Sequence, residues 1–295
     1  MRPRPGRARD DGRVPDRLIV ATEALASGRL TRRDLRQRYT KVYRNVYVPK
    51  GVELTALDRA RAAWLWSGRR AILVGHSAAV LLGSRWIPPE LPAEVAHSRR
   101  DTPRGITMRS NCIRDDELCT VDGIVCTTDA RTCYDLGRRL PLETAVIRID
   151  ALLNATGTAP SRIEEVTARY PGARGVRRLR RALDLVDAGA ESPQETRLRL
   201  LLVWAGLPRP VTQIPVTNEW GRVVRRIDMG WPERMVGAEY DGEQHFENPA
   251  DYANDIVRLE FLANRGWTIV RVSARQLRYE RAEIVARVER ALGRR

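Results

Sequence analysis

The chain has 295 residues and a mass of 33.5 kDa, a length that suits two or three domains of ordinary size better than one. Hydrophobic residues make up 43% and charged residues 30% of it, which excludes general disorder and fibrous repeats. No apolar run reaches the roughly 18 residues that a membrane span needs, and no apolar stretch of a secretion signal follows the basic N-terminus. We therefore expect a cytoplasmic protein with no membrane partner.

The charge balance is strongly basic. The chain carries 52 basic and 37 acidic residues, which gives a formal net charge of +15 and a pI near 10.6. This excess favours a polyanionic partner, either nucleic acid or an acidic protein. Arginine dominates because only Lys41 and Lys50 are lysines, and it binds phosphate and guanine bidentately, although a GC-rich genome also enriches it. Both causes stay open, but no lysine after Lys50 is available for catalysis.

The first stretch, residues 1–52, predicts the element order helix, turn, helix, strand. Asp16 is a candidate N-cap for a first helix and Thr31 for a second one over the sequence TRRDLRQRY. The following segment, KVYRNVYVP, alternates apolar and polar residues as a half-buried strand does. This order is typical of a winged-helix domain, although hardly any residues are left for the third helix of that domain.

Cationic residues are concentrated in the same stretch. The first 50 residues contain 14 basic and 5 acidic side chains, a net charge of +9. Cations interleaved with tyrosines suit contacts to the phosphates and groove edges of duplex DNA. The alternative is a solvated helix face in an arginine-rich protein. The predicted DNA-binding residues are Arg32, Arg33, Arg36, Arg38, Lys41, Tyr43 and Arg44.

The middle stretch, residues 53–189, predicts a mixed α/β segment. LTALDRARAAWLWSG and LPLETAVIRIDALLNAT have helical spacing, whereas GITMRSN and GIVCTT indicate short strands. The sequence ARGVRRLRRAL holds five arginines between Arg174 and Arg181. They form either a second contact to an anion or one solvated helix face, and the sequence leaves both interpretations open.

Two patterns in the middle stretch imitate chemical sites. Four cysteines, at positions 112, 119, 126 and 133, lack the close C-x2-4-C pairs of a zinc site, so we expect buried, reduced thiols. The sequence LVGHSAA imitates the nucleophile elbow of esterases, with Ser77 as the nucleophile. The residues before it indicate helices and basic surface rather than the strands of a hydrolase. We therefore predict that Ser77 caps a helix.

The last stretch, residues 190–295, predicts helix, three strands, helix, strand and a closing helix. Its first helix opens with Ser192 as the capping residue, Pro193 at the first helical position and Glu195 two residues later. This order of elements is that of the restriction-endonuclease-like core. The expected fold class of the whole chain is thus α+β, with a winged-helix-like domain, a mixed middle segment and an α/β restriction-endonuclease-like domain.

Acidic residues in this last stretch are spaced as a metal site requires. Asp228 is predicted to end the second strand, and Glu239 and Asp241 to end the third with both side chains on one face. Carboxylates from adjacent strands bind Mg²⁺, which activates a water for attack on phosphorus. His245 is a candidate base, and strand-end caps are the alternative interpretation of the acids.

Several of these motifs resemble known families. IDMG, AEYDGEQH and DIVRLEFLANRGWTIVRVSARQL resemble the very-short-patch-repair-like endonucleases of the PD-(D/E)xK class. Upstream, LTRRDLRQRY, RNVYVP, HSAAVLLG, GIVCTTDARTCYDLGRRLPLETAVIRIDALL and ESPQETRLRLLLVWAGLP resemble the AbiEi-type antitoxins of type IV toxin–antitoxin pairs. The likeness extends over nearly the whole chain, and its strength is in the order of the motifs.

The resemblance implies an antitoxin that binds double-stranded DNA, represses its own operon and opposes a nucleotidyltransferase toxin. It places Asp228 and Glu239 at the two acidic positions of the nuclease class and Asp241 at the lysine position, which removes a cation from the transition state. We therefore expect an antitoxin that requires no cofactor. The alternative is a DNA endonuclease that uses Mg²⁺ on Asp228 and Glu239.

Overall fold

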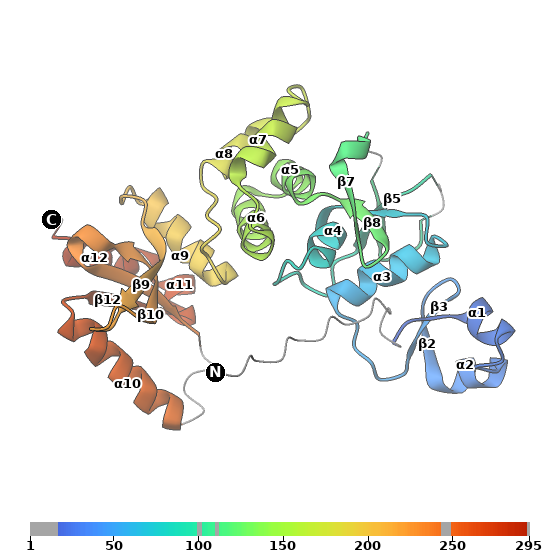
Figure 1. The fold of residues 1–295 in the computed structure, drawn as a ribbon, viewed down its shortest axis with the longest axis horizontal. Helices are drawn as coiled ribbons and strands as arrows, with labels where there is room; N and C mark the ends of the chain where they lie inside the picture. The colour runs from blue at the N-terminus through green and yellow to red at the C-terminus, as the bar shows by residue number, and fades with distance from the viewer. Residues whose placement is uncertain (1–16, 99–101, 110–111, 243–248, 294–295) are drawn as a thin grey trace. The chain divides into compact units, whose positions relative to one another are not determined.

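The computed structural model describes residues 17–98, 102–109, 112–242 and 249–293, and it confirms the α+β class. The chain forms two compact units, one comprising the residues up to Leu136 with Thr158–Pro171 and the other comprising Gly137–Gly157 with the residues from Gly172 onwards (Figure 1). The units meet after Leu136, Gly157 and Pro171, whereas the sequence predicted boundaries near residues 52 and 189. No helix in the described ranges has the length and apolarity to cross a membrane.

The N-terminal module of the first unit contains two short helices and a three-stranded antiparallel sheet of order β1-β3-β2. The predicted first helix is too long, because Ile19 and Val20 pair with β3 as a strand, and Asp16, its predicted cap, lies outside the described residues. The predicted single strand is a hairpin, which turns at Asn45 with a positive φ of 68°. The elements are β1 (Ile19–Val20), α1 (Ala21–Ala26), α2 (Arg32–Arg38), β2 (Tyr39–Tyr43) and β3 (Val46–Pro49).

The rest of the first unit is built on a five-stranded mixed sheet of order β6-β5-β4-β8-β7. Helices α3 and α4 pack on it around an apolar core that includes Leu73, Val95 and Ile124, all fully buried. The elements are α3 (Ala56–Trp66), β4 (Ile72–Leu73), α4 (Gly75–Leu81), β5 (Ala93–Ala96), β6 (Ile106–Met108), a 3-10 turn (Asp115–Glu117), β7 (Leu118–Val121), β8 (Ile124–Thr127), α5 (Asp129–Arg139, which continues into the second unit) and α7 (Pro160–Ala168).

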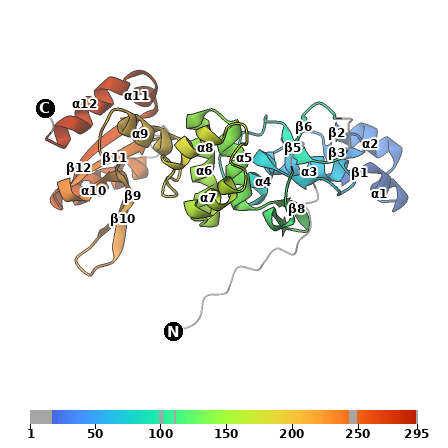
Figure 2. The same ribbon diagram turned by 90° about the horizontal axis from the view of Figure 1, so that it is seen from above.

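The second unit combines three helices that precede its sheet with a four-stranded sheet of order β12-β11-β10-β9. Strands β9, β10 and β11 are antiparallel neighbours, and β12 pairs with β11 in parallel. Figure 2 shows the β9–β10 hairpin projecting from this sheet. The elements are α6 (Leu142–Thr156), α8 (Val176–Leu183), α9 (Pro193–Trp204), β9 (Val211–Thr217), β10 (Val223–Trp231), a 3-10 turn (Pro232–Arg234), β11 (Val236–Asp241), α10 (Pro249–Asn264), β12 (Thr268–Ser273), α11 (Ala274–Tyr279) and α12 (Arg281–Ala291).

The element order predicted for the last stretch is confirmed, with one helix added. Ser192 Oγ accepts a hydrogen bond from Glu195 N and Pro193 opens α9, as the capping pattern predicts. The sequence did not predict α11, which begins with a capping box between Ser273 and Gln276. Asp228 does not end its strand, because β10 continues to Trp231.

Ser77 and the cysteines have structural surroundings. Ser77 lies inside α4 and its Oγ accepts a hydrogen bond from Glu94 N, so the prediction that it caps a helix is wrong. Cys126 and Cys133 are buried and reduced, as expected, whereas Cys112 is exposed. Cys119 and Cys126 face each other across two antiparallel strands with their sulfurs 3.5 Å apart and no disulfide.

Candidate functional site

The short helix α2 and the hairpin after it form a defined cationic surface. Thr31 starts α2 with a capping box, since its Oγ1 accepts from Asp34 N at 3.1 Å and its own N donates to Asp34 Oδ2 at 2.9 Å. Leu35 is buried, so the opposite side of this helix faces solvent. Helix α2 runs directly into β2, and no third helix separates them, as the residue count predicts (Figure 1).

Exposed cations cover α2 and the hairpin. The exposed basic side chains of α2, the turn before it and the hairpin form no ion pair within the described part of the chain. Basic residues elsewhere in the unit do, as Arg69 does with Glu23. Lys50 is also exposed, and its Nζ donates to Arg36 O. Sequence reasoning missed Arg29, which is exposed in the turn before α2. We call this set the N-terminal cationic surface: Arg29, Arg32, Arg33, Arg36, Arg38, Lys41 and Arg44.

Tyr43 is a correction to the predicted DNA-binding set. Its side chain is 5% exposed, and its hydroxyl donates a hydrogen bond of 2.9 Å to Gly105 O. Burial raises the pKa of Tyr43, which keeps the hydroxyl protonated as a donor. Tyr43 therefore anchors the hairpin to the loop before β6, and it is not available to DNA. The ring faces the core together with Val46 and Val48, which are also buried residues of the hairpin.

In the second unit, two predicted acids meet on adjacent strands. Asp228 on β10 and Glu239 on β11 lie next to the paired residues Met229 and Ala238 of the antiparallel register, and Asp228 Oδ2 accepts from Tyr240 N at 2.9 Å. Glu239 is 3% exposed, and its Oε1 accepts from Arg258 of α10 at 2.5 Å. Burial, and after it the charge of Glu239, raises the pKa of Asp228 to about 6. The two carboxylates thus share one poorly solvated environment.

Sequence reasoning missed two residues near these acids, Glu195 and Arg258. We call Asp228, Glu239, Asp241 and Glu195 the acidic cluster. Glu195 of α9 lies close enough for the charge of Asp228 to raise its pKa, in addition to the larger effect of burial. Arg258 supplies the countercharge of Glu239. The sequence predicted Glu195 as part of a helix start, and it has that role. Its proximity to Asp228 could be recognised only from the position of α9 against the sheet.

The acidic cluster does not fit a Mg²⁺ ion. Asp241 pairs with Arg271 at 2.6 Å, and Glu239 pairs with Arg258, so arginines neutralise carboxylates that a metal would need. No group of three Asp, Glu, His or Cys side chains among the described residues is arranged to hold a metal ion. His245, the predicted base, lies outside the described residues.

Comparison with known proteins finds relatives of unassigned function. Two uncharacterized proteins of Mycobacterium tuberculosis, from strains CDC 1551 / Oshkosh and ATCC 25618 / H37Rv, are each 34% identical to this chain over 177 residues. The match covers 60% of this chain and 65% of each relative. No family model and no solved structure matches the chain.

Proposed function

We propose that the protein is a DNA-binding antitoxin and autorepressor, which holds duplex DNA on the N-terminal cationic surface. The observation that carries the proposal is the exposure of seven cations on α2, the turn before it and the hairpin after it, with no ion pair to any described carboxylate. Exposed arginines on a short rigid helix suit phosphates, because each neutralised phosphate releases condensed counterions. The capping box and the anchored hairpin stabilise the backbone that carries these cations.

The proposed arrangement places α2 against one groove and the hairpin turn with Arg44 against the neighbouring backbone. Because α2 has only seven residues, we expect phosphate contacts to provide most of the affinity and base contacts to provide little of it. The antitoxin role rests on the resemblance of the sequence motifs. In that role the second unit, with its neutralised acidic cluster, serves as a scaffold.

The test replaces Arg32, Arg33 and Arg36 together with alanine and measures affinity for a duplex from the promoter of its own operon by fluorescence anisotropy. We expect the slope of log K against log salt to fall in magnitude by about 3, since roughly 0.9 counterions are released per contact. The matched control replaces Arg177, Arg180 and Arg181 of α8, which are also exposed and carry the same charge. Equal losses in both variants would mean that only net charge matters, and no loss in the first would remove the proposal.

The second candidate function is a metal-dependent DNA endonuclease, which the approach of Asp228 to Glu239 favours. The arginine partners of Glu239 and Asp241 lead us to expect no plasmid cleavage by the purified protein with Mg²⁺ or Mn²⁺. The control is Asp228→Ala, which separates intrinsic activity from a contaminating nuclease. Cleavage by the native protein that this substitution abolishes would establish the endonuclease instead.

A further inference from the structure

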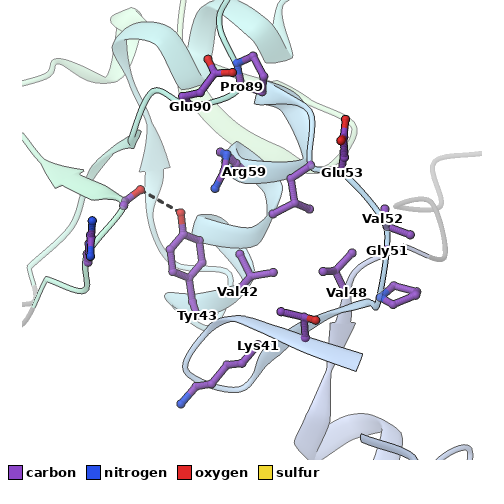
Figure 3. Close-up of a pocket in the computed structure, with 15 residues that line it drawn as sticks. Lys41, Val42, Tyr43, Val48, Gly51, Val52, Glu53, Arg59, Pro89 and Glu90 are labelled. Carbon is purple, nitrogen blue, oxygen red and sulfur yellow. Dashed lines mark hydrogen bonds between the residues drawn. The ribbon is translucent and has the colours of Figure 1, made fainter. Parts of the chain in front are cut away.

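A pocket of about 560 Å³ lies behind the β2–β3 hairpin, within the first unit (Figure 3). Its walls come from both strands of the hairpin, the linker that follows, the start of α3 and two loops near residues 89 and 104. This volume is within the range of small-molecule sites in proteins, which is roughly 300–1,000 Å³. Three valines, a leucine and two prolines supply apolar wall, and the charged lining residues are three basic and two acidic ones: Lys41, Arg59, Arg104, Glu53 and Glu90.

Arg59 is the unusual group in this pocket. Its Nε is buried and has no hydrogen-bond partner, and its guanidinium forms no ion pair with any described carboxylate. In Figure 3 it lies amid the lining residues, with Tyr43 on one side and Pro89 and Glu90 on the other. The buried Nε gives up hydration without gaining a hydrogen bond in exchange, which is costly.

We propose that this pocket binds a small organic oxyanion, a carboxylate or a phosphate ester with a flat apolar body, through the guanidinium of Arg59. The guanidinium presents paired N–H donors that match the two oxygens of such an anion. The apolar body lies against Val42 and Val48 of the hairpin. The bound anion therefore contacts the same hairpin that carries Lys41 and Arg44, and, if the proposed DNA-binding function holds, it couples small-molecule binding to that surface.

The first experiment is isothermal titration calorimetry of the full chain, without DNA, against benzoate, phenyl phosphate and the neutral analogue benzamide. We expect saturable binding of at least one anion with a dissociation constant of about 1 mM or tighter, and none of benzamide. The benzoate and phenyl phosphate titrations separate a carboxylate ligand from a phosphate ligand. Failure of both anions, or equal binding of benzamide, overturns the proposal. Because DNA is absent, this result is independent of the DNA-binding test.

Arg59→Met tests the residue, with Arg162→Met as the control on an exposed arginine of the same unit. We expect anion affinity to fall at least tenfold in the first variant only. The melting temperature of the unliganded Arg59→Met protein should be unchanged or higher, since an unpaired cation is removed; a marked drop would identify a structural role and contradict the proposal. Hydrogen exchange of the amides in residues 40–49 should slow on adding the anion, and unchanged exchange there would place binding elsewhere.

Discussion

At the scale of single residues, Glu94 shows how one buried carboxylate organises a helix start. Helix α4 has Val74 at its N-cap, without a side-chain cap, and Glu94 Oε2 instead accepts from His76 N at 2.7 Å. Arg109 donates to the other oxygen of Glu94. Gly75 is required beside it, because a Cβ there would lie 2.0 Å from Glu94 Oε2 and its φ is +53°. The segment that imitates an esterase elbow is therefore a structural junction.

Because of this junction, part of the stability of the first unit depends on pH. Burial alone would raise the pKa of Glu94, but the hydrogen bonds and charge of His76, together with the charge of Arg109, lower it from 4.5 to about 2. A lowered folded-state pKa stabilises the protein above the unfolded value, and this stability is lost as pH falls from 4.5 towards 2. The shift corresponds to roughly 3 kcal/mol when His76 carries its charge.

We therefore expect Glu94→Gln to lower the free energy of unfolding of the first unit by up to roughly 3 kcal/mol at pH 7 and by much less near pH 2.5. The measurement is hydrogen exchange of β4 and β5 amides in both proteins at the two pH values. The difference between the proteins isolates Glu94 from the other acids that titrate in the same range. A difference that stays constant with pH would show that packing, rather than charge, is lost.

At the scale of elements, helix starts could be predicted from the sequence more reliably than strand pairing could. Thr31 and Ser192 mark helix starts because the capping bonds are local and need only neighbouring residues. The hairpin at Asn45 was missed because the valines before and after its turn keep one alternating phase, which a single strand would also show. Ile19 follows Asp16, the predicted N-cap, and was therefore expected in the first helix, but pairing with Tyr47, which is distant in sequence, makes it a strand residue.

For the candidate sites too, features local in sequence could be predicted, and those that depend on distant contacts could not. The exposed arginines of α2 could be predicted, since the charge and spacing of a short helix are visible in the sequence. The inward position of Tyr43 could not, because it depends on the loop at Gly105. Asp228 and Glu239 were predicted as neighbours from the strand order. The arginines could not be predicted, because Arg258 of α10 meets Glu239, and Arg271 of β12 meets Asp241, only in the folded sheet.

At the scale of the molecule, the second unit depends on residues well upstream of its sheet. Arg199 of α9 is 0% exposed and donates to Asp150 Oδ2 of α6 at 2.7 Å. Asp150 also accepts from Thr196 Oγ1 at 2.9 Å and from Asp187 N at 2.7 Å. This buried network joins α6 to α9, so a division of the chain at residue 189 would cut through it.

A fragment of residues 190–295 therefore retains Arg199 but loses both Asp150 and the Leu185 O that Arg199 also contacts. In the full chain, a charge of this pair left without its partner costs about 3–5 kcal/mol. The fragment lacks the residues that cover Arg199, so its guanidinium meets solvent there and bears no such cost. We expect Arg199→Met to lower the melting temperature of the full chain, where it strands Asp150, and to leave that of the fragment almost unchanged. Thermal denaturation of the four proteins tests this, with Arg197→Met, an exposed-side neighbour on α9, as the control. If Arg199→Met lowers the melting temperatures of the fragment and of the full chain alike, the network does not join the upstream helix to the sheet.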